Sequence, residues 1–217
     1  MTEFLDLESW HRREHFYFFR AYDNPYFNLC ANVDISALKA AASARHPKVS
    51  ISMALFYTSL RAANQVEPFR YRIRDQRVWV HDRIHGGSTV LRDDESFGFS
   101  YFNYQQDFGA FAAEGEAEIE RVKSTRILEP RSDDDDLIHY SVIPWVSFTS
   151  FSHARRWNTD DAVPKLVFGK FFPQGDRYLL PVSVEVHHAL MDGLHVGRFF
   201  EAFQALLDEP EAWLGRP

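Results

Sequence analysis

The sequence contains a single cysteine, Cys30, among its 217 residues. One cysteine excludes an intrachain disulfide and any zinc site that needs several cysteine ligands, so we interpret Cys30 as a small core residue. Basic clusters are equally scarce, because Arg12-Arg13 and Arg155-Arg156 are only pairs in a chain of net charge −7. This charge balance argues against nucleic acid as a partner.

Long apolar runs are also absent. The N-terminus, MTEFLDLESWHRREHF, contains no apolar signal segment, and no stretch approaches the ~20 apolar residues that cross a bilayer. We therefore expect a cytoplasmic protein with no membrane partner. What the chain has in abundance is phenylalanine, 20 residues in all, within a globular composition of 45% hydrophobic residues. Such an aromatic load suits a core, an apolar pocket or a subunit interface.

No repeat, low-complexity linker or change in composition divides the chain, so residues 1–217 are expected to form one domain. The residue patterns predict a helix and then an aromatic strand within 1–20, strands at 26–33, 69–80, 88–91, 97–103, 140–151, 167–172 and 179–186, and helices at 34–44, 50–65, 108–126 and from 193 onward. Gly86-Gly87 is expected to be a loop. The acidic run 133–136 is expected to be a solvated loop, with a metal site as the alternative. The sum is an α+β fold, a two-layer sandwich of a largely antiparallel or mixed sheet with packed helices.

The stretch 182–198, VSVEVHHALMDGLHVGR, changes its periodicity in the middle. Alternation puts Val182, Val184, Val186 and His188 on one face of a strand, and helical spacing begins after Gly193. His188 therefore ends a strand just before a tight connection into an amphipathic helix. A histidine held by rigid elements at such an edge is well placed to act as a general base.

Three interpretations of His188 and Asp192 remain open on these residues alone. In the first, Asp192 caps the last helix and His188 has only a structural role. In the second, His188, Asp192 and His195 bind a metal ion, although the strand-to-helix break makes their convergence awkward. In the third, neutral His188 removes a proton from a nucleophile during acyl transfer while Asp192 holds the loop in shape.

Four blocks in order resemble the chloramphenicol acetyltransferase family, within the wider superfamily of CoA-dependent acyltransferases that carry HxxxD. The blocks are WHRREHFYFFR at 10–20, PWVSFTSF at 144–151, GKFFPQGDRYLLPVSVEVHH at 169–188 and HHALMDGLHVGRF at 187–199. HxxxD alone is a weak signal, whereas four blocks at family-like spacing across nearly the whole chain are specific. The resemblance implies a chloramphenicol acetyltransferase-like fold.

The resemblance also implies a catalytic set. The second histidine of HHxxxDG, His188, corresponds to the general base that deprotonates the acceptor hydroxyl for direct attack on the thioester of acetyl-CoA, without an acyl-enzyme. Ser150 corresponds to the hydroxyl that stabilises the oxyanion. Asp192 corresponds to the aspartate that pairs with the first arginine of the N-terminal block, here Arg12.

Acetyl-CoA is the implied co-substrate, and no metal is expected. Lys170 and Lys48 correspond to lysines that meet the 3′-phosphate of CoA, and Phe171 replaces a frequent tyrosine beside the first of them. Family members are homotrimers whose active sites lie between subunits. We therefore expect a homotrimer in which His188 faces an acceptor pocket on its neighbour.

The departures from the family pattern gather at the acceptor pocket, for which the resemblance implies the residues Phe18, Phe19, His153, Arg155 and Val167. If the insert after PWVSFTSF swings outward, other aromatic residues such as Phe97, Phe148 or Phe151 close the pocket instead. Phe19 stands where a tyrosine is usual, so a hydroxyl is missing. His153 and Arg155 fall on positions that are usually leucine and valine, and Val167 replaces a common threonine. If His153 and Arg155 point inward, they reject an apolar ring or attract a polar or anionic acceptor.

These residues leave three hypotheses. The leading one is chloramphenicol O-acetylation, a reaction that inactivates the antibiotic. The second keeps the chemistry but changes the acceptor to a different, more polar small molecule with a hydroxyl group. The third is a non-catalytic CoA-binding protein on the same fold, which the set of His188, Asp192, Ser150 and Arg12 argues against.

Overall fold

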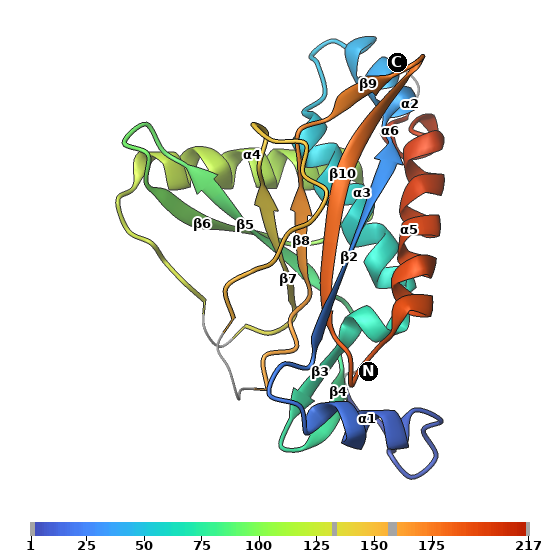
Figure 1. Cartoon of the computed structure of the whole chain (residues 1–217). Coiled ribbons are helices and arrows are strands. Elements are labelled where there is room, and N and C mark those ends of the chain that lie inside the picture. Colours follow the sequence, from blue (N-terminus) through green and yellow to red (C-terminus); the bar gives the residue numbers. More distant parts are fainter. Residues whose placement is uncertain (1–2, 132–133, 156–159, 216–217) are drawn as a thin grey trace.

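The computed structural model describes residues 3–131, 134–155 and 160–215, which form a layer of strands and a layer of helices (Figure 1). The main sheet has the order β2 (Tyr26–Asp34), β10 (Arg177–His187), β8 (Lys165–Phe168), β7 (Leu137–Val142), β5 (His85–Leu91) and β6 (Phe97–Phe102), and β9 (Phe172–Gln174) pairs with the start of β10. Strand β7 is parallel to both neighbours, and the other pairs are antiparallel. The predicted mixed sheet in an α+β fold is confirmed.

One face of this sheet is covered by helices. These are α2 (Ser36–Ser43), α3 (Ile51–Gln65), α4 (Phe108–Ser124) and α5 (Gly193–Asp208), followed by the short α6 (Glu211–Leu214). Alternation along β10 places Val182, Val184 and Val186 in the core against these helices, as the sequence predicts. Helix α3 has buried residues on nearly every side. Its mostly apolar sequence suits this position between the sheet and the neighbouring helices.

A second, smaller unit lies at one end of the main sheet (Figure 1). It consists of α1 (Arg13–Arg20) and a three-stranded sheet in the order β1 (Glu3–Phe4), β4 (Arg77–Val80) and β3 (Tyr71–Arg74). Strand β3 directly follows the 3-10 helix at Glu67–Arg70. Its apolar cluster includes Ala189 and Leu190, which directly follow His188. The packing of this cluster therefore sets the position of α1 relative to the end of β10.

The opposite face of the main sheet carries polar side chains, including Ser183, Glu185 and His187 of β10. Part of the irregular segment 143–164 lies over this face, because the ring of Phe148 approaches Gly169 so closely that a Cβ there would lie 2.9 Å from it. Cys30 of β2 is half-buried on this face, with its Sγ 3.2 Å from Asn28 Oδ1. Our interpretation of Cys30 as a core residue is therefore wrong.

Several local predictions are also wrong. The aromatic run 16–19 lies in helix α1 and not in a strand, because one side of that helix packs Phe16 on the small sheet. The strand predicted at 140–151 ends at Val142, since Pro144 cannot donate to a strand ladder and stands in a turn. Gly86 and Gly87 lie inside β5 and not in a loop.

The prediction that the acidic run 133–136 is a solvated loop is wrong at Asp135. Asp133 lies outside the described residues. The Asp135 carboxylate binds Arg74 and lies 2.9 Å from His81 Nε2. Burial raises the pKa of Asp135, but hydrogen bonds from His81 and Arg74 outweigh it and lower the pKa below its usual value. Asp135 thus joins the loop before β7 to the small sheet.

None of the helices in the described part of the chain is both long and apolar enough to cross a membrane.

Candidate active site

His188 stands immediately after β10, where its backbone N–H donates to the carbonyl of Pro25 over 2.7 Å. Its half-buried imidazole lies parallel to the ring of Phe19, with 3.7 Å between centroids, and against Phe27 at 4.7 Å. The Nδ1 atom is 3.2 Å from the carbonyl oxygen of Met191. Because a carbonyl only accepts hydrogen bonds, this contact places the proton of the neutral imidazole on Nδ1 and leaves the lone pair on Nε2. That is the tautomer a general base needs at Nε2.

Asp192 occupies the N-cap position of α5, where its Oδ1 accepts from the N–H of Leu194 over 3.1 Å. The Asp192 N–H donates in return to His195 Nδ1 over 3.1 Å. The helix-capping interpretation of Asp192 is therefore correct as far as it goes. His195 is occupied with this cap, and within the described ranges no group of three His, Cys, Asp or Glu residues is arranged to hold a metal ion.

The other carboxylate oxygen of Asp192 accepts a hydrogen bond from the buried guanidinium of Arg12, the pair that the family resemblance implies. A second nitrogen of Arg12 donates to the backbone oxygen of His188 over 3.3 Å. Burial raises the pKa of Asp192, but the charges of Arg12 and His195 and the hydrogen bonds from Arg12 and Leu194 together outweigh that effect and lower the pKa below its usual value. Arg12 therefore ties the start of α1 to both ends of the turn that carries His188.

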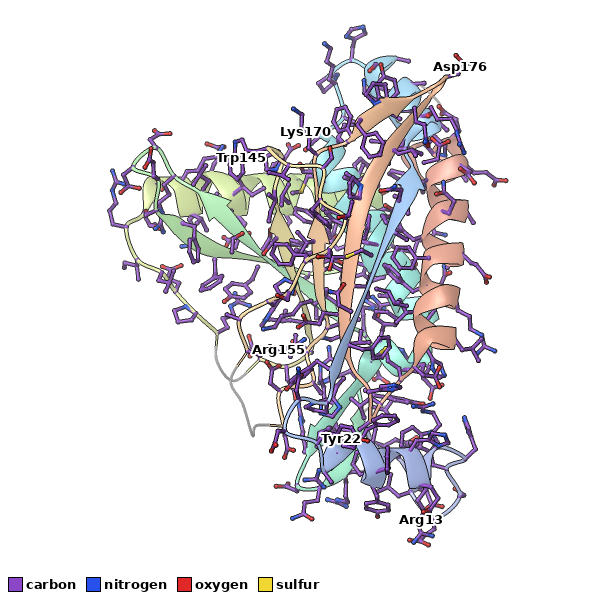
Figure 2. The ribbon with its side chains drawn as sticks, viewed as in Figure 1. Arg13, Tyr22, Trp145, Arg155, Lys170 and Asp176 are labelled. Atoms are coloured by element: carbon purple, nitrogen blue, oxygen red, sulfur yellow. The ribbon has the colours of Figure 1, made fainter. Side chains whose placement is uncertain are left out.

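The candidate CoA residues lie near the other end of β10. Figure 2 shows Lys170 close to Trp145, far from Tyr22 at the end of α1. The Lys170 N–H donates to Val146 over 2.9 Å, and its side chain is exposed. Phe171 is also exposed, its ring centroid 6.1 Å from that of Tyr178.

Lys48 and Ser150 are exposed in irregular segments. Ser150 follows β7 in the segment that was predicted to be a strand. Among the described residues no hydrogen bond joins Ser150 to His188 or to Lys170.

A cavity of about 730 Å³ opens on the polar face of the main sheet. Its lining includes Thr89, Tyr101, His139, His153, Arg155 and Lys165. Of the predicted acceptor residues, the structure brings only His153 and Arg155 to this cavity.

The other predicted acceptor residues lie elsewhere. Phe18 is 58% exposed on α1 and packs against Tyr22, whereas Phe19 faces His188. Phe97 is 46% exposed on β6 beside Phe99. Phe151 packs against Phe148 and His153, and Val167 is fully buried in β8.

Arg155 does not offer a free charge to the cavity. Its guanidinium donates to Glu185 over 2.6 Å and to Asp161 over 3.1 Å, and it lies 4.0 Å from the ring centroid of Tyr26. Burial raises the pKa of Glu185, but hydrogen bonds from His153 and Arg155 outweigh it and lower the pKa to about 2. The expectation that an inward Arg155 attracts an anionic acceptor is therefore not supported, because two carboxylates already balance its charge.

Reasoning from the sequence missed Glu185 and Asp161 as partners of Arg155, and it also missed His139 and Lys165 in the cavity. The alternation along β10 did place Glu185 opposite the apolar face. What it lacked was any indication that residues 153–155 would fold back onto that strand.

The comparisons with known proteins agree with one another. A family model described as chloramphenicol acetyltransferase matches residues 2–204. Chloramphenicol acetyltransferases 2 and 3 of Escherichia coli are each 34% identical to the chain, over 94% and 93% of its length and over 96% and 95% of their own. A solved structure named chloramphenicol acetyltransferase superposes with a TM-score of 0.87 at 28% identity, covering 95% of this chain and 100% of its own.

Proposed function

Because the chain belongs to the chloramphenicol acetyltransferase family, we propose that it is an acetyl-CoA-dependent O-acetyltransferase that acetylates and thereby inactivates chloramphenicol. A single domain over residues 1–217 carries this activity. The observation that supports the proposal most directly is the orientation of His188. Its Nδ1 is held by Met191, so Nε2 is the atom that can take up a proton.

In the proposed mechanism, His188 Nε2 removes the proton from the acceptor hydroxyl as that oxygen attacks the carbonyl carbon of the thioester. Ser150 donates a hydrogen bond to the oxyanion that develops there, an interaction worth roughly 2.7–4 kcal/mol in comparable sites. The C–S bond then breaks, and the proton on His188 passes to the departing sulfur. The products are the acetyl ester and free CoA thiol.

Arg12 and Asp192 have a positioning role in this proposal. Their ion pair ties the N-terminus of α5 to α1, and Arg12 also binds the backbone oxygen of His188. The proton transfer itself does not pass through Asp192, because no contact joins its carboxylate to the imidazole of His188 in the described part of the structure. The pair holds the turn on which the imidazole is mounted.

We further propose that the active enzyme is a homotrimer with its active sites between subunits. In each site CoA is bound by Lys170, Lys48 and Phe171. Two observations support this assembly. The candidate base and the cavity do not meet within one chain, because His188 packs on Phe19 and Phe27 and is absent from the cavity lining. Trp145 and the adjacent Val146 are also 64% and 54% exposed in the single chain, so two neighbouring apolar side chains are left for a second subunit to cover.

The proposed acceptor pocket is the cavity that His153 and Arg155 line, with Phe18, Phe19, Phe97, Phe151 and Val167 contributing where a second subunit completes it. A more polar acceptor is not favoured, since Arg155 is already paired with Glu185 and Asp161.

The test is a thiol-release assay with acetyl-CoA and chloramphenicol, combined with mass measurement of the ester. The matched variant is His188→Ala, which we expect to fold normally and to lose between about 10²- and 10⁴-fold in kcat. Absence of thiol release from folded wild-type protein would contradict the function. Full turnover by His188→Ala would contradict the mechanism.

A further inference from the structure

One row of residues crosses the cavity face of the main sheet from β6 to β2. Each member lies opposite the next one in the strand register. From β6 to β2 they are Tyr101, Gly87, His139, Lys165, Glu185 and Asn28. Neighbouring strands lie about 4.8 Å apart, and side chains on one face at the same register are direct neighbours. A phenol, an imidazole, an ammonium and a carboxylate therefore line up across the floor of the cavity.

The row has one gap, at Gly87. A Cβ at this position would lie 3.1 Å from the ring of Tyr101, so the absence of a side chain lets that ring lean over β5. The neighbour of His139 on β5 is Gly87, which has no side chain to cover the imidazole. The imidazole is consequently open toward the cavity, and His139 is among the cavity-lining residues.

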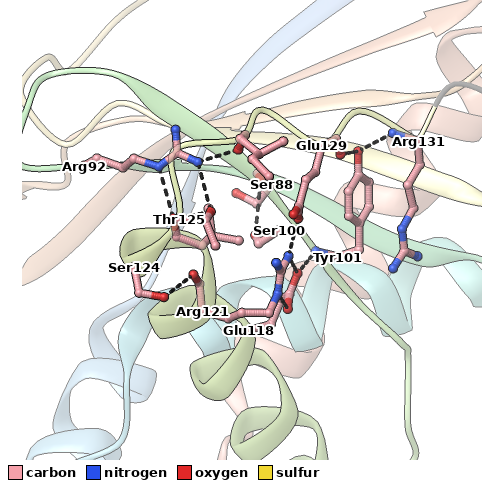
Figure 3. Close-up of polar contacts among 12 residues, drawn as sticks. Ser88, Arg92, Ser100, Tyr101, Glu118, Arg121, Ser124, Thr125, Glu129 and Arg131 are labelled. Carbon is pink, nitrogen blue, oxygen red and sulfur yellow. Dashed lines mark hydrogen bonds and ion pairs between the residues drawn. The ribbon is translucent and has the colours of Figure 1, made fainter.

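Tyr101 is already engaged. Figure 3 shows its hydroxyl beside the segment from Glu129 to Arg131, where it donates to the Glu129 carbonyl over 3.3 Å and accepts from the Arg131 N–H over 2.9 Å. Arg121 holds the same segment by binding both Glu118 and Glu129. Tyr101 thus forms a fixed wall of the cavity.

Lys165 and Glu185 are engaged as well. The Lys165 ammonium donates to the Ala154 carbonyl over 3.0 Å and lies 3.9 Å from Asp161, while Glu185 is paired with Arg155. Within the part of the chain that the structure describes, the imidazole of His139 has neither a hydrogen bond nor an ion pair. It is the side chain of the row whose hydrogen-bonding capacity is left for a ligand.

The chemical state of His139 follows from its surroundings. Burial, together with the charge of Lys165 on the adjacent strand, lowers the pKa of His139 to about 4, while Asp161 acts in the opposite direction. The imidazole is therefore neutral at physiological pH, with one N–H donor and one lone pair. Such a group recognises an uncharged hydroxyl or amide and does not attract an anion.

We propose that His139 is a specificity-determining residue that hydrogen-bonds an uncharged polar group of the acceptor, distinct from the hydroxyl that is acetylated. This inference depends on the proposed function, because it assigns the cavity to the acceptor. It places recognition on a rigid central strand, between β5 and β8, where neighbouring strands fix the position of the imidazole.

The test compares His139→Phe, which keeps a planar ring and removes both hydrogen-bonding atoms, with His139→Gln, which retains a donor and an acceptor. We expect His139→Phe to raise the KM for chloramphenicol about tenfold, the loss of one hydrogen bond, with the KM for acetyl-CoA unchanged. His139→Gln should stay within about threefold of wild type. Binding of chloramphenicol, measured by calorimetry in the same proteins, should follow the same order.

His85 supplies the matched control. It is a half-buried histidine on β5 whose Nδ1 already accepts from the Tyr104 N–H over 2.9 Å, and it is not part of the cavity lining. His85→Phe should lower Tm without changing the KM for chloramphenicol. If His139→Phe leaves acceptor KM and affinity unchanged, or alters both KM values equally, the inference is wrong. Wild-type protein that neither binds nor acetylates chloramphenicol contradicts the proposed function and the inference together.

Discussion

The imidazole of His188 and the ring of Phe19 lie face to face, with 3.7 Å between their centroids and 9° between their planes. Phe19 is on α1, near the start of the chain, and its helix is held in place by the contact between Arg12 and Asp192. The stack therefore transmits the position of α1 directly to the candidate base. It restricts rotation of the imidazole about its side-chain bonds while Met191 fixes the tautomer.

Removing this stack should reduce catalysis more than binding of acetyl-CoA. We expect Phe19→Ala to lower kcat by about tenfold, since an aromatic pair contributes roughly 0.5–1.5 kcal/mol beyond its buried area. Phe19→Tyr keeps the ring and should remain within about threefold of wild type. Steady-state kinetics with both substrates distinguish the two variants. Phe19→Ala with wild-type kcat would show that the stack does not position His188.

The Arg12–Asp192 pair can be separated from the helix cap by the choice of substitution. Asn is as good an N-cap as Asp, so Asp192→Asn keeps the cap on α5 and removes only the charge. It should lower kcat between about 10- and 100-fold through misplacement of the His188 turn. Asp192→Ala loses the cap as well and should show a lower Tm than Asp192→Asn. Equal Tm values for the two variants would mean that the cap contributes nothing.

Glu185 should contribute to the acid sensitivity of the cavity face. Its pKa in the folded protein, about 2, lies below its unfolded value. The stability contributed by its charge is therefore complete above pH ~4.5 and is lost as pH falls toward the folded value, an effect on the order of 3 kcal/mol. Urea unfolding of wild type between pH 7 and pH 3 should show this loss. Glu185→Gln should lack it.

Glu120→Gln provides the comparison, because Glu120 is exposed on α4 and is paired with Lys123. Its acid profile should match that of wild type. If Glu185→Gln also keeps the wild-type profile, the buried network does not stabilise the fold through charge.

Lys170 should contribute to the binding of acetyl-CoA and not to the binding of chloramphenicol. We expect Lys170→Ala to raise the KM for acetyl-CoA about tenfold, the loss of one charge-assisted hydrogen bond, with the chloramphenicol KM unchanged. The effect should disappear with acetyl-CoA that lacks the 3′-phosphate, because the partner of the lysine is then missing. Lys123→Ala, an exposed lysine on α4, serves as the control. An equal increase with both forms of acetyl-CoA would rule out the phosphate as the partner.

The elements that could be predicted from the sequence are those whose pattern is local. Alternation fixed the inner face of β10, and the change of period at Gly193 located the start of α5. The motif blocks single out His188, Asp192 and Arg12 as candidate site residues, and the structure brings Arg12 and Asp192 into contact. The predictions for β10 and for the start of α5 are confirmed because periodicity and capping depend on neighbours within a few residues.

What only the tertiary structure decided are contacts between segments far apart in the chain. The sequence contained Arg155 and Glu185, but their pairing depends on how residues 153–155 fold back over β10. The opening beside His139 likewise depends on strand register, which places Gly87 next to it, and on a glycine pair that local propensity assigns to a loop. Local pattern sets which face a residue takes. Its partner on that face is set by the packing of the whole sheet, because only that packing determines which strands lie side by side.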